Sequence, residues 1–291
     1  MSISRQNLSI VIVTLKSEKV IYNCVKSISK NIPIIIVENS DNQSFKSDIE
    51  SKHENVKCIL SNQNLGMGAG NNIGIKFAQT DYVLVINPDV TLNPNTLDEI
   101  FLASKELKDF SILSPISSDI NFPNYKLFNK IKKNEESAKP FKVKSVDGFA
   151  MLLNKKKFSG DAFFDENFFM YLENDDLCRR VICEEGSIFI IPQAKVNHIG
   201  ANAVNPKFNE EVELSRNWHW IWSKFYFNKK HFGFIRALSV STPSFLTSIL
   251  KFLFFFITRN NLKKKIYFNR ASGFYNALLG KTSWYRPNLN N

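Results

Sequence analysis

Short apolar runs alternate with amphipathic segments along the first third of the chain. Four runs rich in β-branched residues are typical of buried strands: Leu8–Thr14, Ile34–Val37, Val56–Leu60 and Asp81–Ile86. Apolar positions at helical spacing predict three helices: Lys19–Ser29, a helix around Ile73–Ala78 and one from Pro94 to Leu107. Strand and helix in alternation predict a parallel sheet with helices on both faces.

Polar residues gather where these predicted strands end. The loops hold Thr14, Glu38–Ser40, Asn62–Gly74 and Asn87–Asp89. In open α/β sheets, ligands bind at the carboxyl ends of the strands. We therefore expect a binding site built from these loops.

The second half of the chain is less regular. A polar stretch, 117–144, predicts a long loop. Three further elements are predicted: a strand at Val146–Leu153, a helix at Asp175–Glu185 and a strand at Ser187–Pro192 followed by a loop carrying His198.

The C-terminal part is aromatic, apolar and basic. Aromatic residues crowd Trp218–Phe227, and Phe245–Ile257 is almost wholly apolar. Thirteen helical residues span about 20 Å, which is short of a hydrocarbon core of roughly 30 Å. Extending the helix back to Leu238 includes Pro243. We expect a helix on the membrane surface with its basic neighbours on anionic headgroups; the alternative is a buried helix covering the main domain.

These shifts in composition predict two domains. Residues 1–230 would form the main domain. Its first half, at about 1–116, would bind the ligand of the strand-end loops (the donor), and its second half, at about 117–230, would bind a second substrate (the acceptor). Residues 231–291 would form a helical, membrane-associating extension.

Composition narrows the class of protein. The chain has 291 residues, of which 44% are hydrophobic and 22% charged, which excludes a disordered, collagen-like or polytopic membrane protein. A net charge of +11 favours an anionic partner. The four Cys residues show neither a CxxC pair nor zinc-ligand spacing. With no recognisable export signal, reduced cysteines predict a cytoplasmic protein.

Two residues are candidates for holding a metal. Asp89 ends the strand at Asp81–Ile86 and is well placed to hold a divalent cation bound to a diphosphate. His198 follows a later strand and is a candidate second ligand. The alternatives are an ordinary turn at Asn87–Asp89 and a structural histidine.

A glycine- and asparagine-rich segment, Asn64–Gly74, precedes that strand. Gly66, Gly68 and Gly70 would let the backbone approach a ligand closely, and the asparagines would bond a sugar or a base. The spacing matches neither a dinucleotide-binding fingerprint nor a P-loop. A plain flexible loop is the alternative.

Carboxylates cluster at the start of the helix predicted at 175–185. Glu173 and Asp176 are three residues apart and would share a helix face. A carboxylate beside a bound sugar can act as general base toward an acceptor hydroxyl. The alternative is a solvated acidic helix start, which the helix dipole favours.

In order along the chain, these motifs resemble glycosyltransferase family 2, in its rhamnosyltransferase-like branch. The resemblance covers roughly residues 8–230 and includes the Phe-Phe-Met-Tyr-x-Glu-x-x-Asp-Leu-Cys-x-Arg pattern ending at Arg180. It implies a GT-A fold: a Rossmann-like, mostly parallel sheet flanked by helices. It also implies a nucleotide-sugar donor, a divalent metal (Mg²⁺ or Mn²⁺) and inversion at the anomeric carbon.

The resemblance also assigns donor-binding residues, with Glu38 standing where the family usually has Asp. They are Thr14, Glu38, Asn39, Asn64, Gly66, Gly68, Asn71, Asn72, Asn87 and Gly148.

The same resemblance assigns the metal ligands and the base. Asp89 matches the last acidic residue of the family's Asp-x-Asp, whose first position is Asn87 here, and His198 would be a further ligand. The family's proposed base falls on Asn174, which cannot usefully take a proton. The catalytic base is then expected among Glu173, Asp175 and Asp176, with Glu173 favoured and Asp176 supporting or replacing it.

The expected function is transfer of a sugar, with dTDP-rhamnose the favoured donor, to a saccharide hydroxyl in cell-surface polysaccharide synthesis such as O-antigen, capsule or lipopolysaccharide. Acceptors in this branch are often lipid-linked saccharides, so a peripheral location on the inner face of the cytoplasmic membrane is expected. One alternative is a catalytically inactive membrane scaffold, motivated by Asn87 and Asn174. Another is a nucleic-acid-binding protein, which would leave the acidic cluster unexplained, so no nucleic-acid partner is expected.

Overall fold

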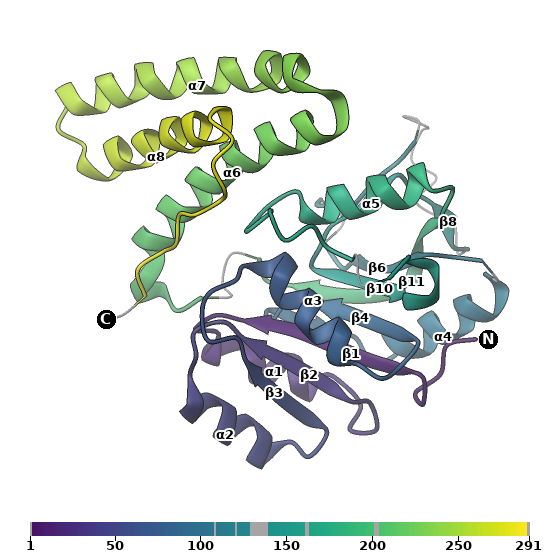
Figure 1. Ribbon diagram of the computed structural model, residues 1–291. Coiled ribbons are helices and arrows are strands. Elements are labelled where there is room, and N and C mark those ends of the chain that lie inside the picture. Colours follow the sequence, from purple (N-terminus) through teal and green to yellow (C-terminus); the bar gives the residue numbers. More distant parts are fainter. Residues whose placement is uncertain are drawn as a thin grey trace. The chain divides into compact units, whose positions relative to one another are not determined.

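The protein forms two compact units. The computed structural model describes residues 2–107, 109–119, 121–128, 139–160, 163–200 and 204–289. The first unit comprises Met1–Asp165 and Asn174–Asn205, and the second comprises Glu166–Glu173 and Pro206–Asn291. Figure 1 shows strands concentrated in the first unit and long helices in the second.

The first unit is built on a mixed sheet. Its strands are β1 (Leu8–Thr14), β2 (Ile34–Glu38), β3 (Val56–Leu60), β4 (Tyr82–Ile86), β5 (Val90–Leu92), β6 (Ile112–Ser117), β8 (Phe141–Lys142), β10 (Ala150–Asn154) and β11 (Ile188–His198). Among the described residues their order is β3-β2-β1-β4-β10-β6-β11-β5, with β8 paired to β11. A separate pair joins β7 (Tyr125–Lys126) to β9 (Ser145–Val146).

The predicted parallel sheet is confirmed for β1 to β4, which all pair in parallel. The second half differs, because β10 lies antiparallel between β4 and β6, with Ala150 opposite Ile86. The strand β11 then pairs in parallel with β6 and antiparallel with β5. The sheet is therefore parallel where strand and helix alternate, and mixed beyond β4.

Helices cover both faces of this sheet. They are α1 (Glu18–Lys26), α2 (Gln43–Lys52), α3 (Met67–Phe77), α4 (Thr96–Glu106) and α5 (Glu173–Cys183). Alternate residues of β1 enter different cores, because side chains along a strand point to opposite faces. Ile10 and Ile12 pack with residues of α1, α2 and α4, whereas Val11 and Val13 pack with residues of α3 and α5.

Several predicted boundaries change in the structure. The helix expected near residue 73 begins at Met67, so most of the Gly/Asn segment is helical rather than a loop. Glycine disfavours helix in isolation, and packing against the sheet supplies the missing stability. The strand β11 continues to His198, which therefore ends a strand rather than lying in a loop. The helix α2 and the strand β6 were not predicted.

The second unit is helical. It contains α6 (Asn209–Phe232), α7 (Phe234–Ile257) and α8 (Asn261–Leu278). The aromatic residues noted at 218–227 lie on α6, and Trp218, Trp222 and Phe225 form its core with Phe274 of α8. A Cβ on Gly273 would overlap the carbonyl oxygen of Trp218, so glycine is what lets α8 approach α6 this closely.

The compact units separate near residue 205, so α6 packs with α7 and α8. The functional boundary expected at residue 230 stays a prediction. The part of the polar stretch 117–144 at positions 120 and 129–138 lies outside the described residues.

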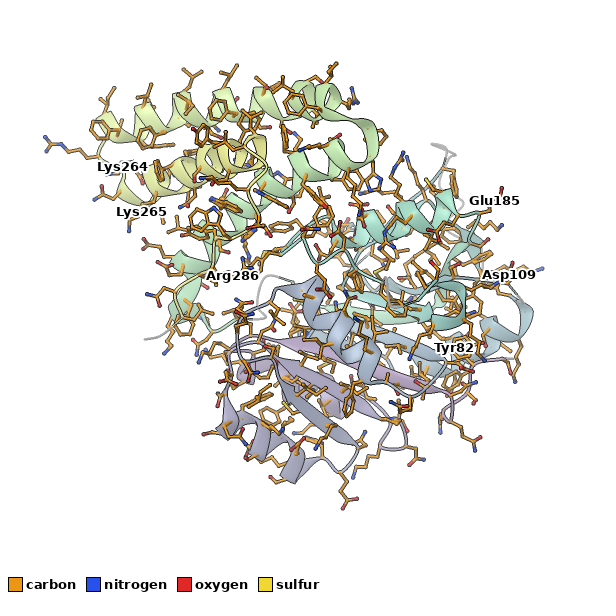
Figure 2. The ribbon with its side chains drawn as sticks, in the orientation of Figure 1. Tyr82, Asp109, Glu185, Lys264, Lys265 and Arg286 are labelled. Carbon is orange, nitrogen blue, oxygen red and sulfur yellow. The ribbon has the colours of Figure 1, made fainter. Side chains whose placement is uncertain are left out.

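A C-terminal segment, residues 281–289, completes the helical unit. The hydroxyl of Ser283 donates a hydrogen bond of 2.7 Å to the carbonyl oxygen of Asn167. The guanidinium of Arg286, labelled in Figure 2, lies 3.8 Å from the centre of the buried Phe169 ring. The end of the chain therefore holds the segment Glu166–Glu173 within this unit.

Candidate active site

The carboxyl ends of β1 and β2 meet as predicted. Thr14 lies opposite Glu38 in the ladder, and the Asn39 backbone N–H donates to the Thr14 carbonyl oxygen at 2.8 Å. The Asn39 side-chain amide donates to the carbonyl oxygen of Gly66 at 3.0 Å. The structure thus brings together four predicted donor-binding residues: Thr14, Glu38, Asn39 and Gly66.

Two buried polar atoms in this region lack a hydrogen-bond partner within the described chain. They are Oγ1 of Thr14 and Oδ1 of Asn71. Asn71 follows Gly70, whose Cβ position is 3.4 Å from the Asn39 amide nitrogen. A buried polar atom without a partner costs free energy, so both atoms are candidates to bond a ligand.

Glu38 is buried and shapes its own loop. Its carboxylate accepts hydrogen bonds from the Ser40 backbone N–H at 2.9 Å, the Ser40 hydroxyl at 2.6 Å and the Asn42 backbone N–H at 2.9 Å. These bonds explain why the longer Glu is accommodated at this position. Its predicted contact with the nucleotide stays a prediction.

The glycines at the start of α3 and within it allow the helix to pack closely on β1. Gly66 caps the helix at a φ of 86°, which favours glycine, and Gly68 is buried in the first turn. A Cβ on Gly70 would lie 2.9 Å from Val13, and a Cβ on Gly74 would overlap Val11. Gly70 therefore lets α3 approach β1, and its expected role in bringing the backbone close to a ligand stays a prediction.

The remaining predicted asparagines of this segment bond the backbone. The Asn64 side-chain oxygen accepts a hydrogen bond from the Gly66 N–H at 3.2 Å. The Asn72 amide donates to the Phe164 carbonyl oxygen at 2.8 Å and accepts from the Phe164 N–H at 2.9 Å. Asn72 thus fixes the chain at Phe164, and its predicted donor contact stays a prediction.

The two predicted metal ligands lie close together. Oδ1 of the buried Asp89 is 3.4 Å from Nε2 of His198. The imidazole stacks on Phe149 with ring centres 4.3 Å apart, and the Asn87 N–H donates to the Phe149 carbonyl oxygen at 2.9 Å. Strand pairing between β11 and β5, with His198 opposite Val90, creates this arrangement.

The donor set fits a divalent cation in part. Oδ1 of Asp89 is buried and makes no hydrogen bond within the described residues, so it is available as a ligand. Across the same residues, no group of three or more His, Cys, Asp or Glu side chains could hold a metal ion. Asp89 and His198 would therefore need ligands from a diphosphate or water to complete a coordination shell.

The acidic residues of α5 have different environments. The side chain of Asp176 is fully buried and pairs with Arg180 at 3.0 Å, and Arg180 also bonds the Phe163 carbonyl oxygen. Asp175 is 16% exposed and pairs with Lys126 at 2.8 Å. This geometry gives Asp176 a structural role, whereas Asp175 keeps an accessible edge.

Glu173 belongs to the second unit and is half-buried. It directly follows Tyr171 and Leu172, whose φ values of 70° and 66° lie in the left-handed region. Bulky residues rarely adopt this conformation, and such strain clusters at functional sites. Glu173 therefore begins α5 after a strained turn.

Asn174 and Gly148 pack against each other. The Asn174 amide donates to the Val146 carbonyl oxygen at 2.9 Å, and a Cβ on Gly148 would lie 3.3 Å from the Cβ of Asn174. The residue that replaces the expected base thus fastens α5 to the chain before β10. A Cβ at position 148 would make this contact tight.

Asp147 was missed by sequence reasoning. Burial raises the pKa of the Asp147 carboxyl; Lys126 opposes the rise, Asp175 adds to it and His198 opposes it. Asp147 therefore shares its electrostatic surroundings with two predicted site residues, Asp175 and His198. Its position next to Gly148 was the available signal.

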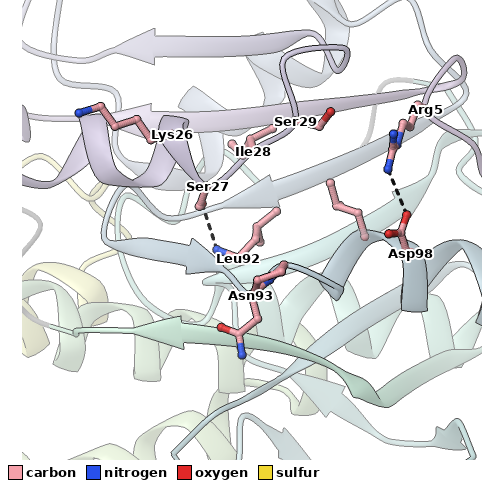
Figure 3. A pocket seen from close by; sticks show the side chains of 10 residues that line it. Arg5, Lys26, Ser27, Ile28, Ser29, Leu92, Asn93 and Asp98 are labelled. Atoms are coloured by element: carbon pink, nitrogen blue, oxygen red, sulfur yellow. Dashed lines mark hydrogen bonds and ion pairs between the residues drawn. The ribbon is translucent and has the colours of Figure 1, made fainter.

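A separate pocket contains no predicted site residue. Figure 3 shows it between the end of α1 and the start of α4, where Arg5 pairs with Asp98 at 3.2 Å and the Leu92 N–H donates to the Ser27 hydroxyl at 3.0 Å. It is therefore not part of the candidate active site.

Comparison with known proteins decides the family. The family model of glycosyl transferase family 2 matches residues 9–162, more than half of the chain. The protein belongs to glycosyl transferase family 2. The predicted family membership is confirmed, and this region carries every predicted donor-binding residue.

Two curated relatives and one solved structure extend the comparison. The low-salt glycan biosynthesis hexosyltransferase Agl10 of Haloferax volcanii is 29% identical over 192 residues, which cover 60% of this chain and 61% of Agl10. The chain thus matches under two thirds of the length of that relative. An N-acetylglucosaminyl-diphospho-decaprenol L-rhamnosyltransferase of Mycobacterium tuberculosis is 22% identical over 212 residues, 59% of this chain and 68% of the relative.

The solved structure shows the fold. The mannosyltransferase PcManGT from Pyrobaculum calidifontis, in complex with GDP-Man and Mn²⁺, aligns with a TM-score of 0.55 at 11% identity, covering 96% of this chain and 87% of that one. The predicted GT-A fold is confirmed.

Proposed function

We propose that this family 2 protein transfers a sugar from a nucleotide-sugar donor to a hydroxyl group of a saccharide acceptor. One observation carries the proposal: the buried Oδ1 of Asp89 lacks a hydrogen bond within the described residues and faces Nε2 of His198 at 3.4 Å. The pair lies at the end of the sheet where the α/β fold binds ligands. Thr14 ends the neighbouring strand β1, and its buried Oγ1 also lacks a hydrogen bond within the described residues.

The proposed cofactor is Mg²⁺ or Mn²⁺, held by Asp89 and His198. When bound, the cation would neutralise charge on the diphosphate leaving group. His198 would ligate as neutral imidazole, and its stacking on Phe149 fixes the plane of the ring. The Mn²⁺ in the PcManGT complex supports this choice of cofactor.

The proposed donor is dTDP-rhamnose. The name of the mycobacterial relative, an L-rhamnosyltransferase, supports rhamnose. Thr14, Asn39 and Asn71 would line the nucleotide, because their polar atoms meet at the ends of β1 and β2 and the start of α3. We also propose a place in the donor site for the other predicted donor-binding residues.

The proposed reaction inverts the anomeric centre. A carboxylate removes the proton of the acceptor hydroxyl, and the oxygen attacks the anomeric carbon opposite the diphosphate. A new glycosidic C–O bond forms as the bond to the diphosphate breaks. Glu173 and Asp175 are the proposed bases, because Asp176 is fully buried against Arg180.

The proposed acceptor is a lipid-linked saccharide at the cytoplasmic face of a membrane, used in cell-surface polysaccharide synthesis. The lipid diphosphate in the name of the mycobacterial relative supports this class of acceptor. Within the part of the chain that the structure describes, one helix, α7, is long and apolar enough to cross a membrane. We propose a peripheral location for the enzyme.

The deciding experiment is turnover of a nucleotide-sugar panel by the full chain, with Mn²⁺, with Mg²⁺ and with a chelator. The panel contains dTDP-rhamnose, UDP-hexoses and GDP-mannose. We expect one donor to release its nucleoside diphosphate only when metal is present. Absence of nucleoside diphosphate release from every donor, with either metal, would overturn the proposal and favour the inactive scaffold.

A further inference from the structure

One face of α7 is apolar and exposed. Leu246, Leu250 and Ile257 are 55%, 68% and 78% exposed, and Leu253 lies on the same face. Their spacing of three and four residues places them in one row along the helix. The opposite face carries Ala237, Ser241 and Ser248, which are buried in the helical unit. A continuous exposed apolar row of this kind marks an interaction surface.

The helix α8 lies antiparallel beside α7. Phe245 stacks on Phe274 with ring centres 4.5 Å apart, and ten residues further along, Phe255 stacks on Tyr267 at 5.6 Å. Residue numbers rise along α7 as they fall along α8, and Figure 1 shows the two helices side by side. A membrane or a partner protein in contact with α7 would therefore also lie close to α8.

Charge in this region has one sign. Residues 234–291 contain no Asp or Glu, so they carry most of the net charge of +11. Their nine basic residues are Arg236, Lys251, Arg259, Lys263, Lys264, Lys265, Arg270, Lys281 and Arg286. Lys265 pairs with Glu210 and Arg286 stacks on Phe169, whereas the other exposed cations of this set complement an anionic partner.

Lysines at the start of α8 reach over aromatic rings of α7. The ammonium group of Lys263 lies 5.1 Å from the centre of the Phe255 ring, and that of Lys264 lies 5.8 Å from the Phe256 ring. Figure 2 shows Lys264 and Lys265 at the beginning of α8. Aromatic rings with cations at their edge suit the boundary between acyl chains and phosphate groups.

We propose that α7 lies in the plane of one anionic membrane leaflet, with the row Leu246–Ile257 among the acyl chains and with Lys263 and Lys264 of α8 on the phosphates. This inference rests on the membrane location in the proposed function, and it adds the orientation in which the helical unit binds the membrane. A membrane-spanning α7 would draw Lys251 and the basic α8 into the hydrocarbon, which is strongly unfavourable. Lying in the plane keeps these cations at the headgroups.

The first test is flotation of the full chain with vesicles of pure phosphatidylcholine, or of three parts phosphatidylcholine to one part phosphatidylglycerol. We expect binding only to the anionic vesicles. The triple variant Leu246→Asn/Leu250→Asn/Ile257→Asn should bind at least about tenfold more weakly, because it removes most of the buried apolar area.

A matched control carries Phe77→Asn and Leu102→Asn, which are 48% and 55% exposed in the first unit. It should bind like the unmodified chain. Lys263→Gln/Lys264→Gln, which leaves the apolar row intact, should also weaken binding to the anionic vesicles. Equal binding by the triple variant and the control would overturn the proposal, as would self-association of the chain in place of vesicle binding.

The second test separates lying in the plane from crossing. Cys183 is exposed and the other three cysteines are buried. The variant Cys183→Ser therefore has no exposed thiol that a maleimide could label. Arg236→Cys and Arg259→Cys then report the two ends of α7 after the protein is added outside preformed vesicles. We expect an impermeant maleimide to label both ends, whereas protection of one end would show crossing. Neither test uses donor or acceptor, so failure here is distinct from failure of the transferase proposal.

Discussion

Oδ1 of Asp89 and Nε2 of His198 lie 3.4 Å apart, although the residues are far apart in the chain. The antiparallel pairing of β5 with β11 brings them together, and the stacked Phe149 ring holds the imidazole. The sheet therefore builds an acid–imidazole pair from two strand ends. This pair is the most direct target for mutation.

Asp89→Asn should lower donor turnover at least about 100-fold, because an amide is a weak ligand for the proposed cation. Thermal stability should stay equal or rise, since a buried carboxylate whose Oδ1 lacks a hydrogen bond is replaced by a neutral amide of the same shape. Asp81→Asn is the control, as Asp81 directly precedes β4 and pairs with Lys156 on the surface. Full turnover by Asp89→Asn would contradict the metal assignment.

Asp176→Asn should reduce the free energy of unfolding by about 3 kcal/mol, because it breaks a buried ion pair with Arg180. Asp175→Asn should change stability by less than about 1 kcal/mol, because its partner Lys126 is solvent-exposed. Urea denaturation of both variants measures the difference. Similar losses in both would show that the two carboxylates have equivalent structural roles.

Gly74→Ala should destabilise the first unit by roughly 1–3 kcal/mol, because its Cβ would overlap Val11 of β1. Val11→Ala in the same chain should restore part of that loss by opening space. Thermal unfolding of the two single variants and the double variant tests the coupling. Strictly additive losses would mean that the helix shifts away from the strand without strain.

Acid should destabilise the second unit through His219. Burial lowers the pKa of His219 to about 3, while its Nε2–H donates to the Tyr285 carbonyl oxygen at 2.8 Å. The unfolded chain takes up the proton near pH 6.5, so the stabilisation is complete above that pH and is lost as pH falls toward 3. The expected slope is about 1.4 kcal/mol per pH unit.

Unfolding followed by tryptophan fluorescence between pH 7 and pH 4, taken as roughly the window set by these pKa values, measures that slope. His219→Gln, which cannot titrate, should flatten it. An unchanged slope in this variant would assign the acid sensitivity to other groups.

The sequence predicted the parallel strands because runs such as Leu8–Thr14 are buried on both faces and leave an unbroken apolar signal. It missed β6, where Pro115 interrupts the run, and α2, whose only buried residues are Phe45 and Ile49. Neither segment has enough periodicity to stand out.

The sequence predicted which residues belong to the candidate site better than it predicted the contacts that those residues make. Asp89 and His198 were both recognised, since each follows a recognisable strand. The ion pair of Asp175 with Lys126 was not, because that pairing depends on where a loop of the polar stretch returns. Gly70 and Gly74 were assigned to ligand approach or overlooked, since sequence alone does not show that Val13 and Val11 lie behind them.

The contact between Ser283 and Asn167 sets an order of events during synthesis. Asn167 leaves the ribosome before Ser283 is synthesised, so the Asn167 carbonyl oxygen gains this partner only later. The strands β1 to β4 have no such requirement and can pair while translation continues. The strands β1 to β4 can therefore pair before the residue that secures the approach to α5 has been synthesised.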